Sequence, residues 1–207
     1  PDYWNSAEEP AVAEEITFKF LLEASQRAIA LQNGEIDVCI DPPTTDLQFL
    51  EEDKNVEVYT RAGTRLFYMG FNVSKAPFDN QKLRQAVSCA IDKETIIDIV
   101  LDGRGQWQTS VLNRGAWSFL DNDEVEGGYA YDVERAKALL AEAGYKPGEL
   151  TVELVAATDD PYKTIAPIIQ ANLKEIGINV TIKSMDQATL KVECANGHQQ
   201  MFLWRWN

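Results

Sequence analysis

The sequence predicts an α/β fold, and the alternation of two hydrophobic periodicities in its last third carries that prediction. Leu150, Val152 and Leu154 alternate with polar neighbours as in a strand, residues 165–176 have the spacing of an amphipathic helix, and residues 180–183 alternate again. A strand, a helix and a second strand in this order predict parallel pairing with a right-handed crossover.

The end of the chain continues the same pattern. A helix over residues 187–195 and an aromatic-rich strand over residues 201–206 are expected. The start of the preceding helix stays open between Pro161 and Thr164, because Pro167 suits a first turn but would kink a helix interior.

The longest run of agreeing local signals is residues 67–105. Alternating apolar residues predict a strand from Phe67 to Val73, and Asp79 is the expected N-cap of a following helix. Asp92 is the expected N-cap of a second helix, which Gly103 is expected to end in a left-handed conformation. The expected apolar faces are Leu83, Ala86, Val87 and Ala90 on the first helix, and Ile96, Ile97, Ile99 and Val100 on the second.

The first part of the chain has the same two periodicities in shorter pieces. Period-2 alternation predicts three strands, and helical spacing predicts two short helices, the second capped by Thr45 or Asp46. The polar segment Arg61–Thr64 is the expected crossing to a second domain. The predicted strands cover residues 15–21, 36–40 and 56–60, and the helices cover residues 24–33 and 45–52.

An irregular segment, Gln106 to Tyr129, separates the two regular regions. Its length predicts a functional loop, and Trp107 and Trp117 argue that it is ordered. Asp132 then caps a helix that Gly144 ends, with Val133, Ala136, Leu140 and Ala143 on its apolar face.

Composition places the chain among globular proteins and excludes some partners. It is 45% hydrophobic and 25% charged, and its 19 basic and 33 acidic residues give a formal net charge of -14. That charge argues against nucleic acid and against direct binding to an anionic lipid surface. No run of about 20 apolar residues and no signal peptide is present.

The metal-binding and nucleophilic residue types are few. Cys39, Cys89 and Cys194 sit inside apolar segments and are interpreted as small core residues, and the single histidine, His198, is interpreted as a surface residue. One histidine and scattered cysteines cannot build a Cys/His metal site, so no metal and no cofactor are expected.

No enzymatic constellation is specific enough to predict catalysis. The pair Asp159–Asp160 and the carboxylates Asp121, Asp123, Glu124 and Glu126 would suit glycoside hydrolysis only if they faced each other across a groove. Solvated loop carboxylates are the favoured interpretation. A calcium loop opening at Asp121 is rejected because Glu126 stands where its glycine is required.

Several local motifs, taken together in their order along the chain, resemble one protein family. They are Phe71-Asn72, Pro77-Phe78-Asp79-Asn80, Leu83-Arg84-Gln85-Ala86, Ala90-Ile91-Asp92-Lys93, Gly103-x-Gly105, Tyr131-Asp132, Lys137 to Tyr145 and Ile169 to Ile178. With these motifs the chain resembles the bacterial extracellular solute-binding proteins of the dipeptide, oligopeptide and nickel class, which are the capture subunits of ABC importers.

The resemblance implies a fold, a mechanism and partners. The fold is a periplasmic-binding-protein-like (class II, Venus-flytrap) fragment, with mixed sheets flanked by helices. Residues 1–64 would be part of the first lobe and residues 65–207 an incomplete second lobe, since Pro1–Trp4 resembles the middle of a family member. Closure of the lobes would bury an oligopeptide or related small solute, and a membrane permease would receive it. The protein would be a monomer, not an enzyme, at the extracellular face of the cell envelope, in the periplasm or lipid-anchored.

The resemblance also selects candidate ligand-binding residues and leaves the ligand open. Dipeptide-binding relatives carry an arginine just before the Pro161-Tyr162 pair, where this chain has Asp159–Asp160. In peptide-binding relatives an aspartate follows a similar tryptophan, whereas this sequence stops at Asn207. Longer or cationic peptides, a sugar, nickel, or a peptide signal sensed without transport therefore remain alternatives. The candidate ligand-binding residues are Trp107, Trp117, Asp160, Tyr162, Gln187, Trp204 and Trp206.

Overall fold

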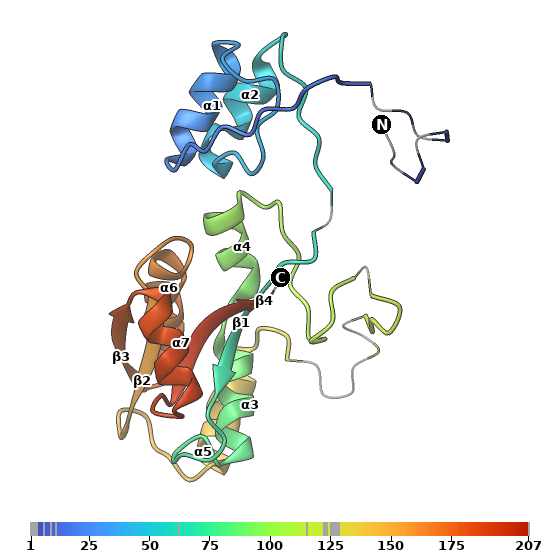
Figure 1. Ribbon diagram of the computed structural model, residues 1–207. Coiled ribbons are helices and arrows are strands. Elements are labelled where there is room, and N and C mark those ends of the chain that lie inside the picture. Colours follow the sequence, from blue (N-terminus) through green and yellow to red (C-terminus); the bar gives the residue numbers. More distant parts are fainter. Residues whose placement is uncertain are drawn as a thin grey trace. The chain divides into compact units, whose positions relative to one another are not determined.

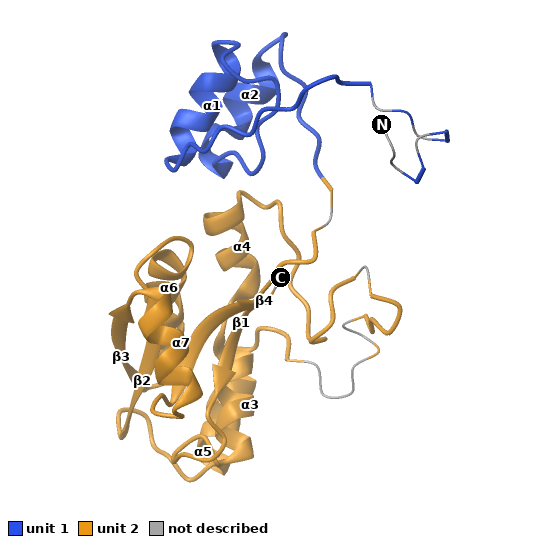
Figure 2. Cartoon of the chain, in the orientation of Figure 1, with its two compact units in different colours: residues 1–60 blue, residues 61–207 orange. Residues whose placement is uncertain are grey.

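The computed structural model describes residues 4–5, 7–8, 10, 12–61, 63–114, 116–121, 124 and 129–206. The chain forms two compact units, residues 1–60 and 61–207 (Figure 2). The domain boundary predicted from the sequence, between residues 64 and 65, lies a few residues after the division between these two units. Asp123, Glu126 and Asn207, which entered the sequence arguments, lie outside the described residues, as do Pro1 to Tyr3.

The described residues of the first unit form two short α-helices and one 3-10 turn. Helix α1 (Ala24–Gln32) and helix α2 (Leu47–Glu52), preceded by η1 (Thr44–Asp46), match the predicted positions. Asp46 occupies the predicted N-cap position of α2, but its side chain makes no capping hydrogen bond, and Thr45 lies inside η1. Three fully buried apolar residues, Ala28, Ala30 and Leu50, form the unit's small core.

The three strands predicted for the first unit are wrong. Residues 15–21, 36–40 and 56–60 are extended or irregular segments without strand pairing. Their alternation is that of strands, but pairing needs a neighbouring strand, and none of the described residues supplies one. Ile16, Phe18 and Phe20 are consequently 72%, 76% and 90% exposed.

The second unit is built on one four-stranded mixed sheet (Figure 1). Its strands are β1 (Leu66–Phe71), β2 (Leu150–Ala157), β3 (Ile178–Met185) and β4 (Met201–Trp206), in the order β1-β4-β2-β3. Strand β2 runs parallel to both β3 and β4, and β1 is antiparallel to β4. The predicted parallel βαβ unit is therefore confirmed.

Helices flank this sheet. The connections β2-α6-β3 and β3-α7-β4 run in opposite directions along the sheet, so right-handed crossovers place α6 and α7 on opposite faces. Helix α6 packs on β2 and β3 beside α3 and α4, and Leu190 of α7 is fully buried. The helices are α3 (Gln81–Ala90), α4 (Lys93–Leu101), α5 (Val133–Glu142), α6 (Tyr162–Glu175) and α7 (Gln187–Ala195). Among the described residues, none of the helices has both the length and the apolar character needed to span a bilayer.

The ends of the helices follow the sequence prediction with two corrections. Asn80, and not Asp79, is the N-cap of α3: its side-chain oxygen accepts from the backbone N–H groups of Lys82 and Leu83. The chain is already extended at Asn80, which places the first free helix amides within reach of that residue and not of its neighbour. Helix α4 ends at Asp102, whose φ of 50° precedes the left-handed Gly103. Asp92 and Asp132 cap α4 and α5 as predicted.

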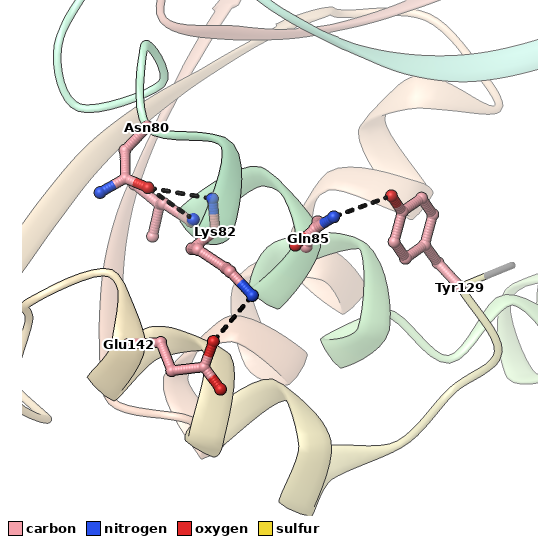
Figure 3. Close-up of polar contacts among 6 residues, drawn as sticks. Asn80, Lys82, Gln85, Tyr129 and Glu142 are labelled. Carbon is pink, nitrogen blue, oxygen red and sulfur yellow. Dashed lines mark hydrogen bonds and ion pairs between the residues drawn. The ribbon is translucent and has the colours of Figure 1, made fainter. Parts of the chain in front are cut away.

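Helix α3 is held by a buried apolar face and by polar contacts with its neighbours. The predicted stripe of Leu83, Ala86, Val87 and Ala90 is buried. Figure 3 shows two further ties: Lys82 pairs with Glu142 of α5 at 2.8 Å, and Gln85 donates to the Tyr129 hydroxyl at 3.3 Å.

The expected apolar face of α4 is only partly buried. Ile96 and Val100 pack against the core, whereas Ile99 is 58% exposed. The backbone at Gly105 packs closely against Ile97 and Leu101. A Cβ added to Gly105 would lie only 2.6 Å from Leu101 Cδ1. The prediction was wrong for Ile99, whose side chain is mostly exposed to solvent.

Helix α6 starts between Pro161 and Thr164, the two positions that the sequence left open. The helix begins at Tyr162 after Pro161, and Pro167 lies inside it. Of the three cysteines, all are free thiols: Cys89 is buried, and Cys39 and Cys194 are half-buried.

Candidate functional site

The carboxyl ends of β2, β3 and β4 meet at one edge of the sheet. Because these strands are parallel, the residues that follow each of them lie on the same side of the unit. The antiparallel register brings the start of β1 to this edge too, with Leu66 opposite Trp206 and Tyr68 opposite Trp204. In open α/β sheets, ligands bind outside the carboxyl ends of the strands.

A hollow of about 330 Å³ lies at this edge, lined by Gln187, Trp204, Arg205 and Trp206. Trp204 and Trp206 are two residues apart on a strand and so share one face of the sheet. Trp206 is 68% exposed and Trp204 is half-buried. The hollow therefore presents two indole rings beside an amide group, which suits a ligand with an apolar part and polar groups.

Gln187 is held in place by the start of α7. Asp186 caps that helix by accepting from the Thr189 backbone N–H and hydroxyl, at 3.0 and 2.6 Å. These bonds, above all the one from the Thr189 hydroxyl, lower the pKa of Asp186. The Gln187 amide donates to Asp159 Oδ2 at 2.6 Å, so the helix start is tied to the residue that follows β2.

Asp160 lies at the same edge, in an exposed local network. Its carboxylate pairs with Lys163 at 2.7 Å and accepts from the Thr164 hydroxyl at 3.1 Å. The hydrogen bond from Lys163 is the main cause that lowers the pKa of Asp160. Asp160 is thus a carboxylate whose charge is already matched within the chain.

Tyr162 lies beneath this edge and is only 2% exposed. Its ring meets the Phe67 ring edge-on, with centroids 5.9 Å apart and planes at 69°. Burial raises the pKa of the Tyr162 hydroxyl, and the positive charge of Arg205 opposes that rise. The ring therefore packs in the core, while charged groups at the edge of the sheet affect the pKa of its hydroxyl.

The two tryptophans of the irregular segment lie elsewhere. Trp107 is half-buried, and Lys93 Nζ lies 5.5 Å from the centre of its ring. Lys93 also donates to the carbonyl oxygens of Ser88 and Tyr129, at 3.0 and 2.7 Å, which fastens this segment to the α3–α4 corner. Trp117 is fully exposed. Neither ring lines the hollow, so their role in binding stays a prediction.

The structure thus gathers five of the seven candidates at one edge and leaves two apart. Gln187, Trp204 and Trp206 line the hollow together, and Asp160 and Tyr162 follow β2 at the same edge of the sheet. Sequence reasoning missed Tyr68, which lies opposite Trp204. The antiparallel pairing of β1 with β4, which joins residues 130 to 140 positions apart, has no signature in local periodicity.

A metal site finds no support. Among the residues with described positions, no group of three or more His, Cys, Asp or Glu side chains could hold an ion. His198 is exposed, as predicted, beside Glu193 at 3.4 Å.

Comparison with known proteins gives a consistent result. The family described as "Bacterial extracellular solute-binding proteins, family 5 Middle" matches residues 1–207. Heme-binding protein A of Haemophilus influenzae is 31% identical over 210 residues, and Di/tripeptide-binding protein 3 of Pseudomonas aeruginosa is 31% identical over 209 residues. These alignments cover 100% and 99% of this chain but only 37% and 38% of the two relatives.

A solved structure agrees in fold. The ABC transporter-associated periplasmic binding protein DppA of Helicobacter pylori, in complex with the peptide STSA, superimposes with a TM-score of 0.77 at 28% identity. The match covers 90% of this chain and 35% of that one. The chain therefore has the fold of part of a periplasmic binding protein and spans a little over a third of the length of such proteins.

Proposed function

We infer that this chain, which belongs to the bacterial extracellular solute-binding proteins of family 5, is the part of an importer's capture protein that holds a peptide or related small solute. The observation that carries this proposal is the hollow at the carboxyl edge of β2, β3 and β4, lined by Gln187, Trp204, Arg205 and Trp206. The family consists of solute-binding proteins, and the proposed role is binding without chemical change of the ligand.

The proposed binding surface uses both ring faces and polar groups. The indoles of Trp204 and Trp206 would cover apolar side chains or the flat peptide units of a ligand. Gln187, fixed by its bond to Asp159, offers the amide oxygen to a ligand N–H. Asp160 and Tyr162 are proposed at the rim, and Trp107 and Trp117 as contacts from the irregular segment.

Capture by such a surface requires a second surface to close on it. We propose that residues 65–207 belong to the second lobe and residues 1–64 to the first lobe of a protein that closes on its ligand. A closed state is populated when the ligand contacts both lobes, and a membrane permease of an ABC importer would recognise that state. The protein is proposed to act as a monomer at the extracellular face of the cell envelope.

Calorimetric titration of the full-length protein tests the proposal. The panel contains dipeptides, tri- to pentapeptides with and without basic residues, cello-oligosaccharides and chelated nickel. Peptide binding is expected, and Trp204→Ala should weaken it about 30-fold, the loss typical of an aromatic residue at the centre of an interface.

Tyr131→Ala is the matched control, since Tyr131 is an exposed aromatic residue outside the hollow. Its affinity should stay within about twofold of the unaltered protein. Binding of sugar or nickel alone would overturn the peptide assignment. Equal losses in both variants, or no binding to any member of the panel, would overturn the assignment of the hollow.

A further inference from the structure

Gln187 brings a hydrogen-bond acceptor to the hollow. Its Nε2 group donates to Asp159 Oδ2 at 2.6 Å, and a carboxylate can only accept, so this bond fixes which way the amide faces. The amide oxygen Oε1 has no hydrogen-bond partner among the described residues. The group that Gln187 offers to a ligand is therefore an acceptor, which requires a donor on the ligand.

The Asp159 carboxylate behind Gln187 carries a charge that the described chain does not match. Its neighbour Asp160 is paired with Lys163 at 2.7 Å, whereas no lysine, arginine or histidine among the described residues lies within ion-pair distance of Asp159. The bond from Gln187 uses Oδ2 and leaves Oδ1 open, and the residue is exposed to solvent. A cation that reaches Gln187 Oε1 would therefore also meet a carboxylate with a free oxygen.

Two positive features near the hollow do not cancel this charge. Arg205 alternates with Trp204 and Trp206 along β4, so its side chain points to the opposite face of the sheet. The positive end of the α7 dipole is met by the carboxylate of its N-cap residue, Asp186. The face of the sheet that carries the two tryptophans therefore has a negative charge beside it.

Two indoles next to an acceptor and a carboxylate suit a cation on an apolar stem. Trp204 and Trp206 share one face of β4, and Trp206 is 68% exposed. Aromatic faces attract ammonium and guanidinium groups, and the side chains of lysine and arginine lay their methylene stems along apolar surfaces while the charged end stays among polar groups. The N-terminal ammonium of a peptide has no such stem, so a basic side chain fits the hollow better.

We propose that the hollow receives a basic side chain of the peptide, with Trp204 and Trp206 along its stem, Gln187 Oε1 as hydrogen-bond acceptor and the Asp159 carboxylate as counterion. This inference rests on the proposed function and names the ligand class, which is peptides that contain lysine or arginine. The formal net charge of -14 favours the approach of such ligands.

The test is calorimetric titration of the full-length protein with tripeptides that differ only at the central residue, which is lysine, Nε-acetyl-lysine or norleucine. Each peptide is used with a free and with an acetylated N-terminus. The lysine peptide should bind at least about 10-fold tighter than both neutral analogues in either form. Because Asp159 is exposed, this preference should weaken as the salt concentration is raised.

Two variants locate the charge that produces the preference. Asp159→Asn keeps an acceptor for Gln187 and removes the negative charge, so the preference for lysine should fall to about twofold while the neutral peptides keep their affinity. Glu134→Gln is the matched control, because it removes one exposed negative charge from α5, outside the hollow. The preference should stay within about twofold of its original value in this control.

The outcomes separate this inference from the proposed function. Equal binding of the lysine peptide and its neutral analogues by the unaltered protein would overturn the inference and leave peptide capture standing. The same follows if the preference persists in Asp159→Asn, falls equally in Glu134→Gln, or disappears when the N-terminus is acetylated. Failure of every peptide to bind would overturn the proposed function itself. Because the preference and its salt dependence are measured first in the unaltered protein, the inference can fail even if a variant does not fold.

Discussion

Replacement of Asn80 by alanine should destabilise the second unit far more than replacement of its neighbour Asp79. The Asn80 side-chain oxygen accepts from Lys82 N at 2.9 Å and from Leu83 N at 3.4 Å, and its amide donates to the Ala143 carbonyl at 3.1 Å. The residue therefore begins α3 and also ties it to the end of α5, as part of the network around Lys82 in Figure 3.

The magnitude follows from these bonds. Loss of an N-cap costs about 1 kcal/mol, and loss of the donor to Ala143 leaves a carbonyl without that partner, at about 1 kcal/mol more. Asn80→Ala should thus lower the free energy of unfolding by about 2 kcal/mol. Asn80→Asp retains the acceptor and places a negative charge at the helix N-terminus, so only the second loss remains, partly offset by the helix dipole.

Urea unfolding of the chain, followed by tryptophan fluorescence, measures the effect. Asp79→Ala is the matched control: Asp79 is exposed, and its side chain makes no bond with any described residue, so its cost should stay within about 0.5 kcal/mol. The reasoning is refuted if Asp79→Ala costs as much as Asn80→Ala, or if Asn80→Asp costs more than Asn80→Ala.

Three further changes test other parts of the fold. Gly70→Ala should cost about 1–3 kcal/mol, because its Cβ would lie 2.5 Å from Cε1 of Phe202, and the cost should vanish in a Phe202→Ala background. The hydrogen bonds from Thr189 lower the pKa of the Asp186 carboxyl, so they stabilise the folded state above the unfolded pKa. This stabilisation is lost as the pH falls through the folded pKa, below about 4. In Thr189→Val the free energy of unfolding should therefore fall less steeply as the pH is lowered through this range. Lys93→Met should free the segment that precedes α5, since the carbonyls of Ser88 and Tyr129 lose their donor, and limited proteolysis should cut that segment faster than in the unaltered protein.

The second unit was predictable because its signals are local. The stripe of Leu83, Ala86, Val87 and Ala90 needs only one buried face, and that face is buried. The order of strand, helix and strand from Leu150 onward determines a parallel pair before any partner is known. Caps were predictable to within one residue, and the shift from Asp79 to Asn80 reflects where the backbone turns extended, which composition does not report.

The first unit shows the opposite case. Ile16, Phe18 and Phe20 have the correct period for a strand, but a strand also requires a partner, and the described residues of this unit offer none. Period 2 in a sequence therefore predicts which side chains would share a face, and it cannot predict whether a neighbouring backbone is there to receive the hydrogen bonds.

The candidate site was predictable from the sequence only in part. Trp204 and Trp206 were predictable from the sequence as rings on one face of a strand, because that depends on period 2 alone. That Gln187 adjoins them depends on two parallel crossovers, and that Arg205 shares a face with Tyr162 depends on the pairing of β1 with β4. An arginine between two tryptophans is difficult to explain from the sequence as core packing, and the register accounts for it: Arg205 lies opposite Phe67, on the face of the sheet that does not carry the two tryptophans.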